Sequence, residues 1–102
     1  MIYIMWEFNV SPQLRSEFET AYRSDGVWAK LLRRDPAYAK TILVRNGAEE
    51  LSGNYLTIDI WNSREAYSQF KDRFADEYLR TDKLCEALTK SERFVGIFEE
   101  LP

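Results

Sequence analysis

Histidine is absent from this 102-residue sequence, and cysteine occurs once, as Cys85. Without an imidazole the chain cannot build a Ser-His-Asp or Cys-His catalytic group in its usual form. Nor can it hold zinc or haem through histidine. A single cysteine excludes an intrachain disulfide and a cysteine-based metal cluster. We interpret Cys85, which lies between Leu84 and Leu88, as a small apolar residue on a helix, with a reactive thiol as the alternative.

Long apolar runs and basic clusters are also missing. No run approaches the roughly 18–20 apolar residues that cross a bilayer. Residues 1–10 lack the basic start of a signal peptide and are interrupted by Trp6, Glu7 and Asn9. One unpaired cysteine fits a reducing compartment, so we expect a cytoplasmic protein. A net charge of −3 gives no electrostatic basis for a nucleic-acid partner, and no membrane partner is expected.

The length predicts a single domain over residues 1–102 with one modest core. Alternating apolar residues predict strands at 2–10, 38–45, 55–61 and 94–99. Helical spacing predicts helices after Ser11-Pro12, at 27–32, and from an Asn62 cap to a break at Thr81-Asp82. Asn46-Gly47 predicts a turn between the strands at 38–45 and 55–61. The order β-α-β-β-α-β is that of an α+β, ferredoxin-like fold, with a four-stranded antiparallel sheet and its helices on one face.

The segment 55–61 is the most informative strand. Leu56, Ile58 and Ile60 point to one face, which we assign to the core under the helices. The other face carries Tyr55, Thr57, Asp59 and Trp61, a mixture too polar for a dry core and too apolar for water. The other strands also have one mixed face each, and together these contribute Tyr3, Met5, Glu7, Thr41, Leu43, Arg45, Arg93, Val95 and Ile97.

A monomer rarely exposes such a mixed but largely apolar sheet face, so we expect a homodimer whose facing sheets enclose a cavity. The last strand can be read with either parity. A buried carboxylate in that cavity either pairs with a cation or has its pKa raised until it serves as a base. Glu7 and Asp59 are the candidates for the base, and interface ion pairs are the alternative. The aromatic stripe of Tyr67, Phe70, Phe74 and Tyr78 is interpreted as core.

Several segments together resemble the antibiotic biosynthesis monooxygenase family of the dimeric α/β-barrel superfamily. They are Trp6-Glu7-Phe8, Phe18-Glu19 with Tyr22, Gly26-Val27-Trp28-Ala29, and Tyr55-x-Thr57-x-Asp59-x-Trp61-x-Ser63 with Tyr67 and Phe70. The resemblance spans nearly the whole chain. It implies a ferredoxin-like protomer, a dimer, and in some members oxygenation of aromatic polyketides or quinols without any cofactor.

The resemblance also assigns one site residue. Trp61 matches a tryptophan that the family places in its pocket, whereas the family's first-strand asparagine position carries Trp6 here rather than Asn9. The haem-degrading branch requires a helix histidine, which this chain lacks.

Cofactor-free oxygenation needs a base, a dry cavity and stacking surfaces, because a deprotonated phenol can itself reduce dioxygen. Asp59 or Glu7 is the expected base and no metal is expected. The expected substrate-binding residues are Trp61, Tyr55, Thr57, Tyr3, Met5, Arg45 and Arg93. The alternatives are a non-catalytic dimer that binds a small apolar ligand, and a pathway accessory protein that isomerises or cyclises an unstable intermediate.

Overall fold

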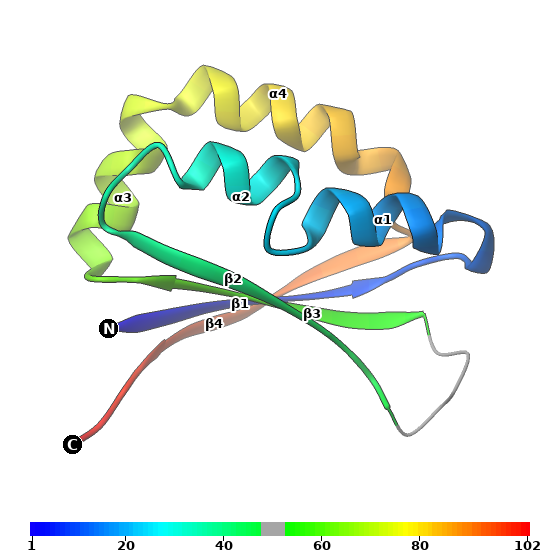
Figure 1. Ribbon diagram of the computed structural model, residues 1–102, viewed down its shortest axis with the longest axis horizontal. Helices are drawn as coiled ribbons and strands as arrows, with labels where there is room; N and C mark the ends of the chain where they lie inside the picture. Colours follow the sequence, from blue (N-terminus) through cyan, green and yellow to red (C-terminus); the bar gives the residue numbers. More distant parts are fainter. Residues whose placement is uncertain (48–52) are drawn as a thin grey trace.

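The computed structural model describes residues 1–47 and 53–102 of the chain (Figure 1). The predicted loop that continues from Gly47 to Ser52 lies largely outside these residues. In chain order the elements are β1 (Ile2–Asn9), the 3₁₀ helix η1 (Pro12–Leu14), α1 (Arg15–Tyr22), α2 (Val27–Leu32), β2 (Tyr38–Arg45), β3 (Asn54–Trp61), α3 (Arg64–Arg73), α4 (Ala75–Cys85), the 3₁₀ helix η2 (Glu86–Leu88) and β4 (Ser91–Glu99).

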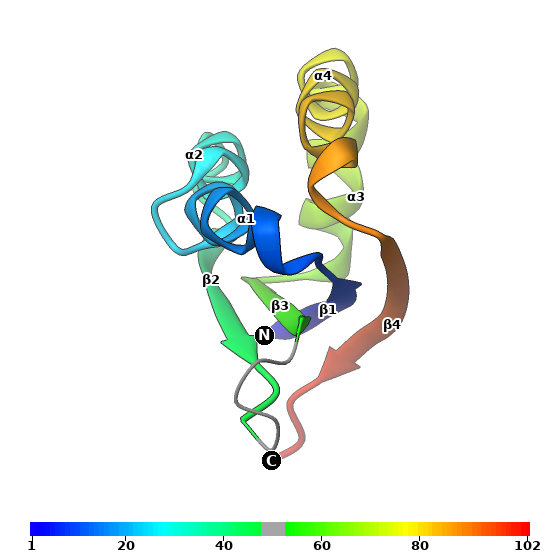
Figure 2. The ribbon, with the colours of Figure 1, turned by 90° about the vertical axis from the view of Figure 1, so that its right-hand side faces the viewer.

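The four strands form one antiparallel sheet in the order β2-β3-β1-β4. Figure 2 shows all the helices above one face of this sheet, with α1 and α2 in one column and α3 and α4 in another. The predicted α+β, ferredoxin-like fold is therefore confirmed. The opposite face of the sheet, here called the outer face, carries no helix from residues 1–47 or 53–102. Among the described residues, no helix is long and apolar enough to span a membrane.

Two helix boundaries and one capping hydrogen bond differ from the prediction. The cap of α3 is Ser63, whose extended backbone lets its hydroxyl accept a hydrogen bond from the Ala66 N–H, so the predicted Asn62 cap was wrong. The predicted break at Thr81-Asp82 instead lies at Phe74, whose φ of −112° and ψ of 31° leave the helical range. Ser11 precedes η1, but its hydroxyl makes no capping hydrogen bond.

The predicted faces of β3 were reversed. Residues directly opposite each other in an antiparallel pair share a face. Asp59 is opposite Ile4 and Tyr55 is opposite Phe8, and both partners are buried under the helices. The helix-facing side of β3 is therefore Tyr55, Thr57, Asp59 and Trp61. The aliphatic side, Leu56, Ile58 and Ile60, lies on the outer face.

The same register argument assigns the neighbouring strands. Thr41, Leu43 and Arg45 of β2 stand opposite Asp59, Thr57 and Tyr55, so they also belong to the helix side.

The last strand changes parity at a bulge. Phe94 is opposite Trp6, but Ile97 is opposite Ile4, so one extra residue is inserted in β4 between these pairs. Gly96 lies in this bulge with φ of 154°, a conformation that L side chains rarely adopt. Glu92, Phe94 and Ile97 therefore all lie on the helix side of the sheet. The bulge explains why the sequence permits either parity for this strand.

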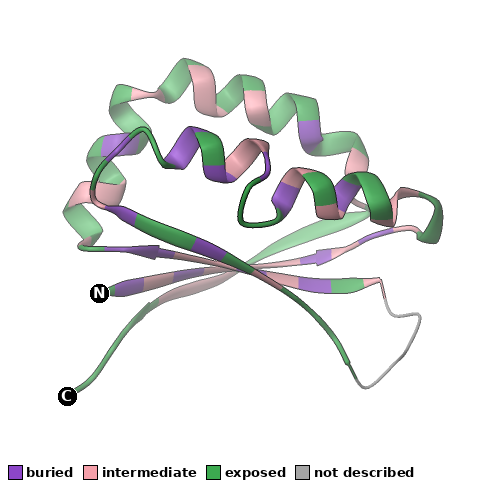
Figure 3. Ribbon diagram, in the orientation of Figure 1, coloured by how far each residue is buried: buried purple, intermediate pink, exposed green. Residues whose placement is uncertain are grey.

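The core consists of two separate clusters rather than one. The first comprises Ile2, Ile4, Leu31, Leu32, Tyr38, Trp61 and Phe70. The second comprises Phe8, Val10, Phe18, Tyr22, Tyr55 and Cys85. Trp6 and Trp28 pack against both clusters, and Figure 3 shows buried residues both in the strands and in the helices above them. Cys85 is buried, as its interpretation as an apolar helix residue predicts.

Candidate functional site

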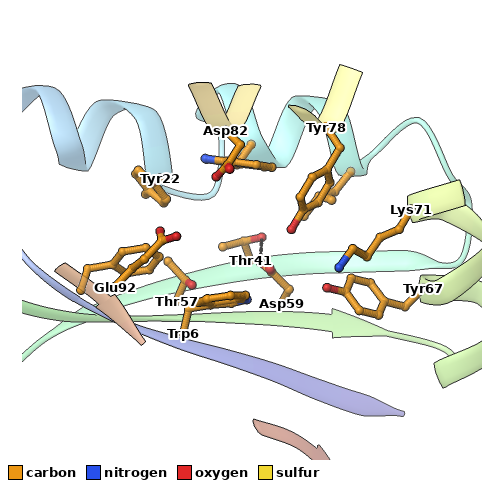
Figure 4. Close-up of a pocket in the computed structure, with 13 residues that line it drawn as sticks. Trp6, Tyr22, Thr41, Thr57, Asp59, Tyr67, Lys71, Tyr78, Asp82 and Glu92 are labelled. Carbon is orange, nitrogen blue, oxygen red and sulfur yellow. Dashed lines mark hydrogen bonds between the residues drawn. The ribbon is translucent and has the colours of Figure 1, made fainter. Parts of the chain in front are cut away.

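A pocket of about 220 Å³ lies between the sheet and the helices, in the region where the two core clusters meet. Its lining residues come from the sheet and from all four α-helices (Figure 4): Trp6, Phe8, Tyr22, Trp28, Leu32, Thr41, Thr57, Asp59, Tyr67, Lys71, Tyr78, Asp82 and Glu92. The pocket belongs to one chain. It is thus not the cavity between facing sheets that the sequence suggested for Thr57 and Asp59.

Asp59 is the central ionisable group of this pocket. It is half-buried, and within the described residues it has no salt-bridge partner; the Thr41 hydroxyl donates a 2.6 Å hydrogen bond to its Oδ1. Loss of hydration raises the pKa of Asp59 to about 6, although the Thr41 hydrogen bond acts in the opposite direction. A carboxyl group with such a pKa is ionised at pH 7 and is more basic than an exposed aspartate.

Aromatic rings form much of the wall around Asp59. Trp6 lies on the sheet side, and its ring meets Phe94 edge-on at 5.2 Å between centroids. Trp28 and Tyr78 form an edge-on pair on the helix side at 5.0 Å. In Figure 4 the Tyr78 hydroxyl points into the pocket toward Thr41 and Asp59. Desolvation raises the pKa of Tyr78, so it is a neutral hydroxyl at physiological pH.

Exposed charged residues lie at the edge of the pocket. Lys71 of α3 stands over the rings of Tyr67 and Tyr78, at 5.3 and 5.2 Å from their centroids. Asp82 of α4 and Glu92 of β4 supply two carboxylates on another side. Desolvation, reinforced by the nearby Asp82 charge, raises the pKa of Glu92. The lining therefore has three carboxylates and one ammonium group.

The other predicted binding residues of β3 lie near the pocket but do not line it. Trp61 is fully buried beside Tyr38, Tyr67 and Phe70, and within the described residues its Nε1 has no hydrogen-bond partner. Tyr55 packs on Phe18 and donates a 2.5 Å hydrogen bond to Glu19. Both are core residues.

Arg45 lies at the end of β2, opposite Tyr55 and away from Asp59. It is exposed and is not among the residues that line the pocket.

The remaining predicted residues are on the outer face. Glu7 Oε1 accepts a 3.1 Å hydrogen bond from Arg93 Nε, and the two side chains form an ion pair on the far side of the sheet from Asp59. Tyr3 donates to Glu100, and Met5 stands opposite Ile58. The structure therefore brings together Asp59 and Thr57, and it separates them from Glu7, Tyr3, Met5 and Arg93.

The sequence did not identify several lining residues. Tyr67 and Tyr78 belong to the aromatic stripe that was interpreted as core, and of this stripe Phe70 alone is fully buried. Lys71 was not singled out from the sequence, and Asp82 entered only as part of the predicted break at Thr81-Asp82. The spacing of Tyr67 and Lys71 at i and i+4 places these two on one side of α3, which is a sequence signal for them; Tyr78 lies beyond the break at Phe74. Among the described residues, no group of histidine, cysteine, aspartate and glutamate could hold a metal ion.

Comparisons of sequence find no match: no family model matches the chain, and no curated protein does. Comparison of structures does. A cofactor-independent oxygenase, SnoaB from Streptomyces nogalater, matches with a TM-score of 0.72 at 16% identity over 99% of this chain and 93% of that one.

Two further solved structures are similar over the whole chain. A putative antibiotic biosynthesis monooxygenase from Nitrosomonas europaea has a TM-score of 0.72 at 14% identity, with all of both chains covered. One from Deinococcus radiodurans has a TM-score of 0.75 at 10% identity, covering 100% of this chain and 94% of that one. At such identities the likeness is one of fold. The chain therefore has the fold of the antibiotic biosynthesis monooxygenases, as the resemblance in its sequence implied.

Proposed function

We propose that this protein is a cofactor-independent monooxygenase that acts on a small phenolic or quinol-type aromatic compound, with Asp59 as the base. The observation that carries the proposal is a half-buried carboxylate without a cationic partner in the described structure, set in a pocket walled by aromatic rings. The likeness of fold to SnoaB, a cofactor-independent oxygenase, supports the same reaction class.

The reaction needs only the substrate, dioxygen and a base. Asp59 takes the proton of the phenol, and the resulting phenolate passes electrons to dioxygen, which bonds to an unsubstituted ring carbon. The proton returns to the peroxide formed there. Loss of the ring hydrogen with cleavage of the O–O bond then gives a quinone and one water. A phenol and one dioxygen are thus consumed, and one oxygen atom is retained in the product.

The pocket supplies the conditions for this step. Its aromatic walls bury a flat ring and keep water away from the phenolate, which strengthens every electrostatic interaction with it. An apolar cavity of roughly 150 Å³ holds benzene. The volume of about 220 Å³ therefore suits one or two fused rings, with larger substrates extending past the edge.

An oxygen electrode tests the proposal directly. The protein, free of added metal and flavin, is given a phenol, a naphthol and anthrone as probes, and quinone formation is followed optically. We expect one dioxygen consumed per quinone, with one atom of ¹⁸O₂ in the product. Ligand-dependent thermal stabilisation without oxygen uptake by any probe would instead support the binding-protein alternative.

We further propose that a second copy of the chain covers the outer face. This face carries Met5, Ile42, Val44, Leu56, Ile58 and Phe98, and Ile42, Val44 and Phe98 are 37%, 39% and 45% exposed. A largely apolar sheet face of this kind is typical of a protein interface. The outer face is more apolar than the sequence suggested, because the aliphatic side of β3 lies there.

A further inference from the structure

Two buried hydroxyl groups form a chain that ends on Asp59. Thr41 Oγ1 donates to Asp59 Oδ1 at 2.6 Å, and the Tyr38 hydroxyl lies 2.7 Å from the same Thr41 oxygen. A threonine hydroxyl has one proton, which Thr41 gives to the carboxylate, so Tyr38 must donate in the second bond. Thr41 and Tyr38 are 4% and 7% exposed, so water does not compete for these bonds.

We propose that Thr41 is the positioning residue of this site: its hydroxyl, oriented by Tyr38, holds Oδ1 of Asp59 and leaves Oδ2 to take the proton of the substrate. This inference rests on the proposed function. Thr41 is well placed for the role because it stands directly opposite Asp59 in the register of β2 and β3. Both residues line the pocket, and Tyr38 lies behind them in the first core cluster, beside Trp61.

The direction of the chain keeps the proton off Oδ1 of Asp59 and leaves Oδ2 as the site that binds it. If Oδ1 carried the proton and donated to Thr41, Thr41 would donate to Tyr38, and the Tyr38 proton would need another acceptor. The described part of the chain records no such acceptor for Tyr38. This agrees with the effect of Thr41 on the pKa of Asp59, which it lowers against the larger effect of burial.

Other titratable groups face Asp59 from the elements around the pocket. They are Tyr22 of α1, Tyr67 and Lys71 of α3, Tyr78 and Asp82 of α4, and Glu92 of β4. Within the described residues, none of them hydrogen-bonds to the Asp59 carboxylate, which Thr41 contacts. Lys71, Asp82 and Glu92 can act on Asp59 through their charges, but Thr41 is placed to fix the orientation of the carboxylate.

The test compares Thr41→Val, which keeps the shape and removes the hydroxyl, with Thr41→Ser, which keeps the hydroxyl. Tyr38→Phe removes the outer member of the chain. Thr57→Val is the matched control for the titration, because Thr57 is a buried pocket threonine with no recorded bond to Asp59. The readouts are kcat and KM for the phenol probe, the pH profile of kcat/KM, and the carboxyl titration of Asp59 by ¹³C NMR.

For Thr41→Val we expect kcat at pH 8 to fall about tenfold, with KM within about twofold, because the carboxylate loses its orientation. The Asp59 titration midpoint should rise by about one pH unit, since a hydrogen bond to the charged form is lost. Thr41→Ser should remain within about twofold of wild type, and Tyr38→Phe should fall between the two. Thr57→Val should leave the midpoint unchanged.

An active wild-type protein whose Thr41→Val variant keeps its kcat and its Asp59 midpoint would overturn the inference. Equal losses in Thr41→Val and Thr41→Ser would also overturn it, because the hydroxyl would then not be responsible. A wild-type protein that takes up no oxygen with any probe is a different result, which defeats the proposed function itself. Circular dichroism melts identify any variant that fails to fold. If Thr41→Val does not fold, the comparison of Thr41→Ser with Tyr38→Phe becomes the deciding test of the inference.

Discussion

Asp59 stands directly opposite Ile4 in the register of β3 and β1, and Ile4 is fully buried beneath the helices. Opposed residues share a face, so this one pair determines that Asp59 points toward the helices and the pocket. It also places Thr57 and Trp61 on the same side. The outer face is left with the aliphatic residues of β3, which separates the candidate catalytic chemistry from the candidate interface.

The first prediction concerns stability and pH. Burial raises the pKa of Asp59 to about 6, above its value of roughly 4 in an unfolded chain, so the folded state binds this proton more tightly. Folding free energy from this group is therefore lost as pH rises from about 4 to about 6. We expect Asp59→Asn to be more stable than wild type by about 1–3 kcal/mol at pH 8, and to lose that advantage at pH 4.

Urea denaturation at the two pH values measures this difference. Lys71→Gln, at the pocket edge, is a useful comparison because it changes a charge without removing the Asp59 carboxyl. An Asp59→Asn advantage of the same size at pH 4 and pH 8 would mean that ionisation of Asp59 has no part in it.

The second prediction concerns the other candidate base. Glu7 pairs with Arg93 on the outer face, where their side chains are 45% and 65% exposed, and such pairs contribute less than about 1 kcal/mol. We expect Glu7→Gln to keep kcat within about twofold of wild type and to leave the pH midpoint of kcat/KM unchanged. Steady-state oxygen uptake measures both. A loss of kcat as large as that of an Asp59 variant would instead indicate that the catalytic base lies on the outer face.

The third prediction concerns assembly. Ile42 lies on the outer face opposite Ile58 and is 37% exposed, so Ile42→Glu places a charge in the proposed interface. Light scattering should give twice 12.1 kDa for wild type and 12.1 kDa for the variant. Leu79→Glu is the control, because Leu79 is 64% exposed on α4, away from the outer face. A monomeric wild type at micromolar concentration would contradict the proposed dimer.

The fourth prediction concerns substrate charge. Asp82 and Glu92 place two carboxylates at the pocket beside Asp59, so an anionic substrate meets repulsion. We expect the double variant Asp82→Asn with Glu92→Gln to raise kcat/KM for a carboxylated phenol about threefold to tenfold relative to the neutral phenol.

Competition kinetics with the two phenols measure the ratio of their kcat/KM values. The effect of the double variant on this ratio should be smaller at high salt than at low salt, because salt screens the charges. Glu86→Gln, an exposed change outside the pocket lining, should leave the ratio unchanged. An equal effect of Glu86→Gln would attribute the selectivity to overall charge rather than to the pocket.

The element order was predictable from the sequence, because strand alternation and helical spacing are local properties of the chain. The predicted span of β2, from Tyr38 to Arg45, agrees with the structure. The faces of β3 were not predictable in the same way. The aliphatic side of Leu56, Ile58 and Ile60 is the more hydrophobic, yet Tyr55 and Trp61 fill the core with larger rings. Only the pairing with β1, a long-range property, decides between them.

The candidate site was predictable in part for a similar reason. Asp59 and Thr57 share a strand, so their common face follows from alternation alone. Their helix-borne neighbours Tyr78 and Lys71 depend on how α3 and α4 lie over the sheet, including the break at Phe74. The role of Thr41 depends on the register of β2 against β3. No local pattern in the sequence contains that register.

The most direct test of the central claim is the rate of oxygen uptake by Asp59→Asn with the phenol probe that wild type turns over fastest. The variant keeps the size of the side chain and removes the base. We predict a fall in kcat of about a hundredfold or more, with unchanged circular dichroism and substrate affinity. A folded Asp59→Asn protein whose kcat stays within about threefold of wild type would contradict this prediction.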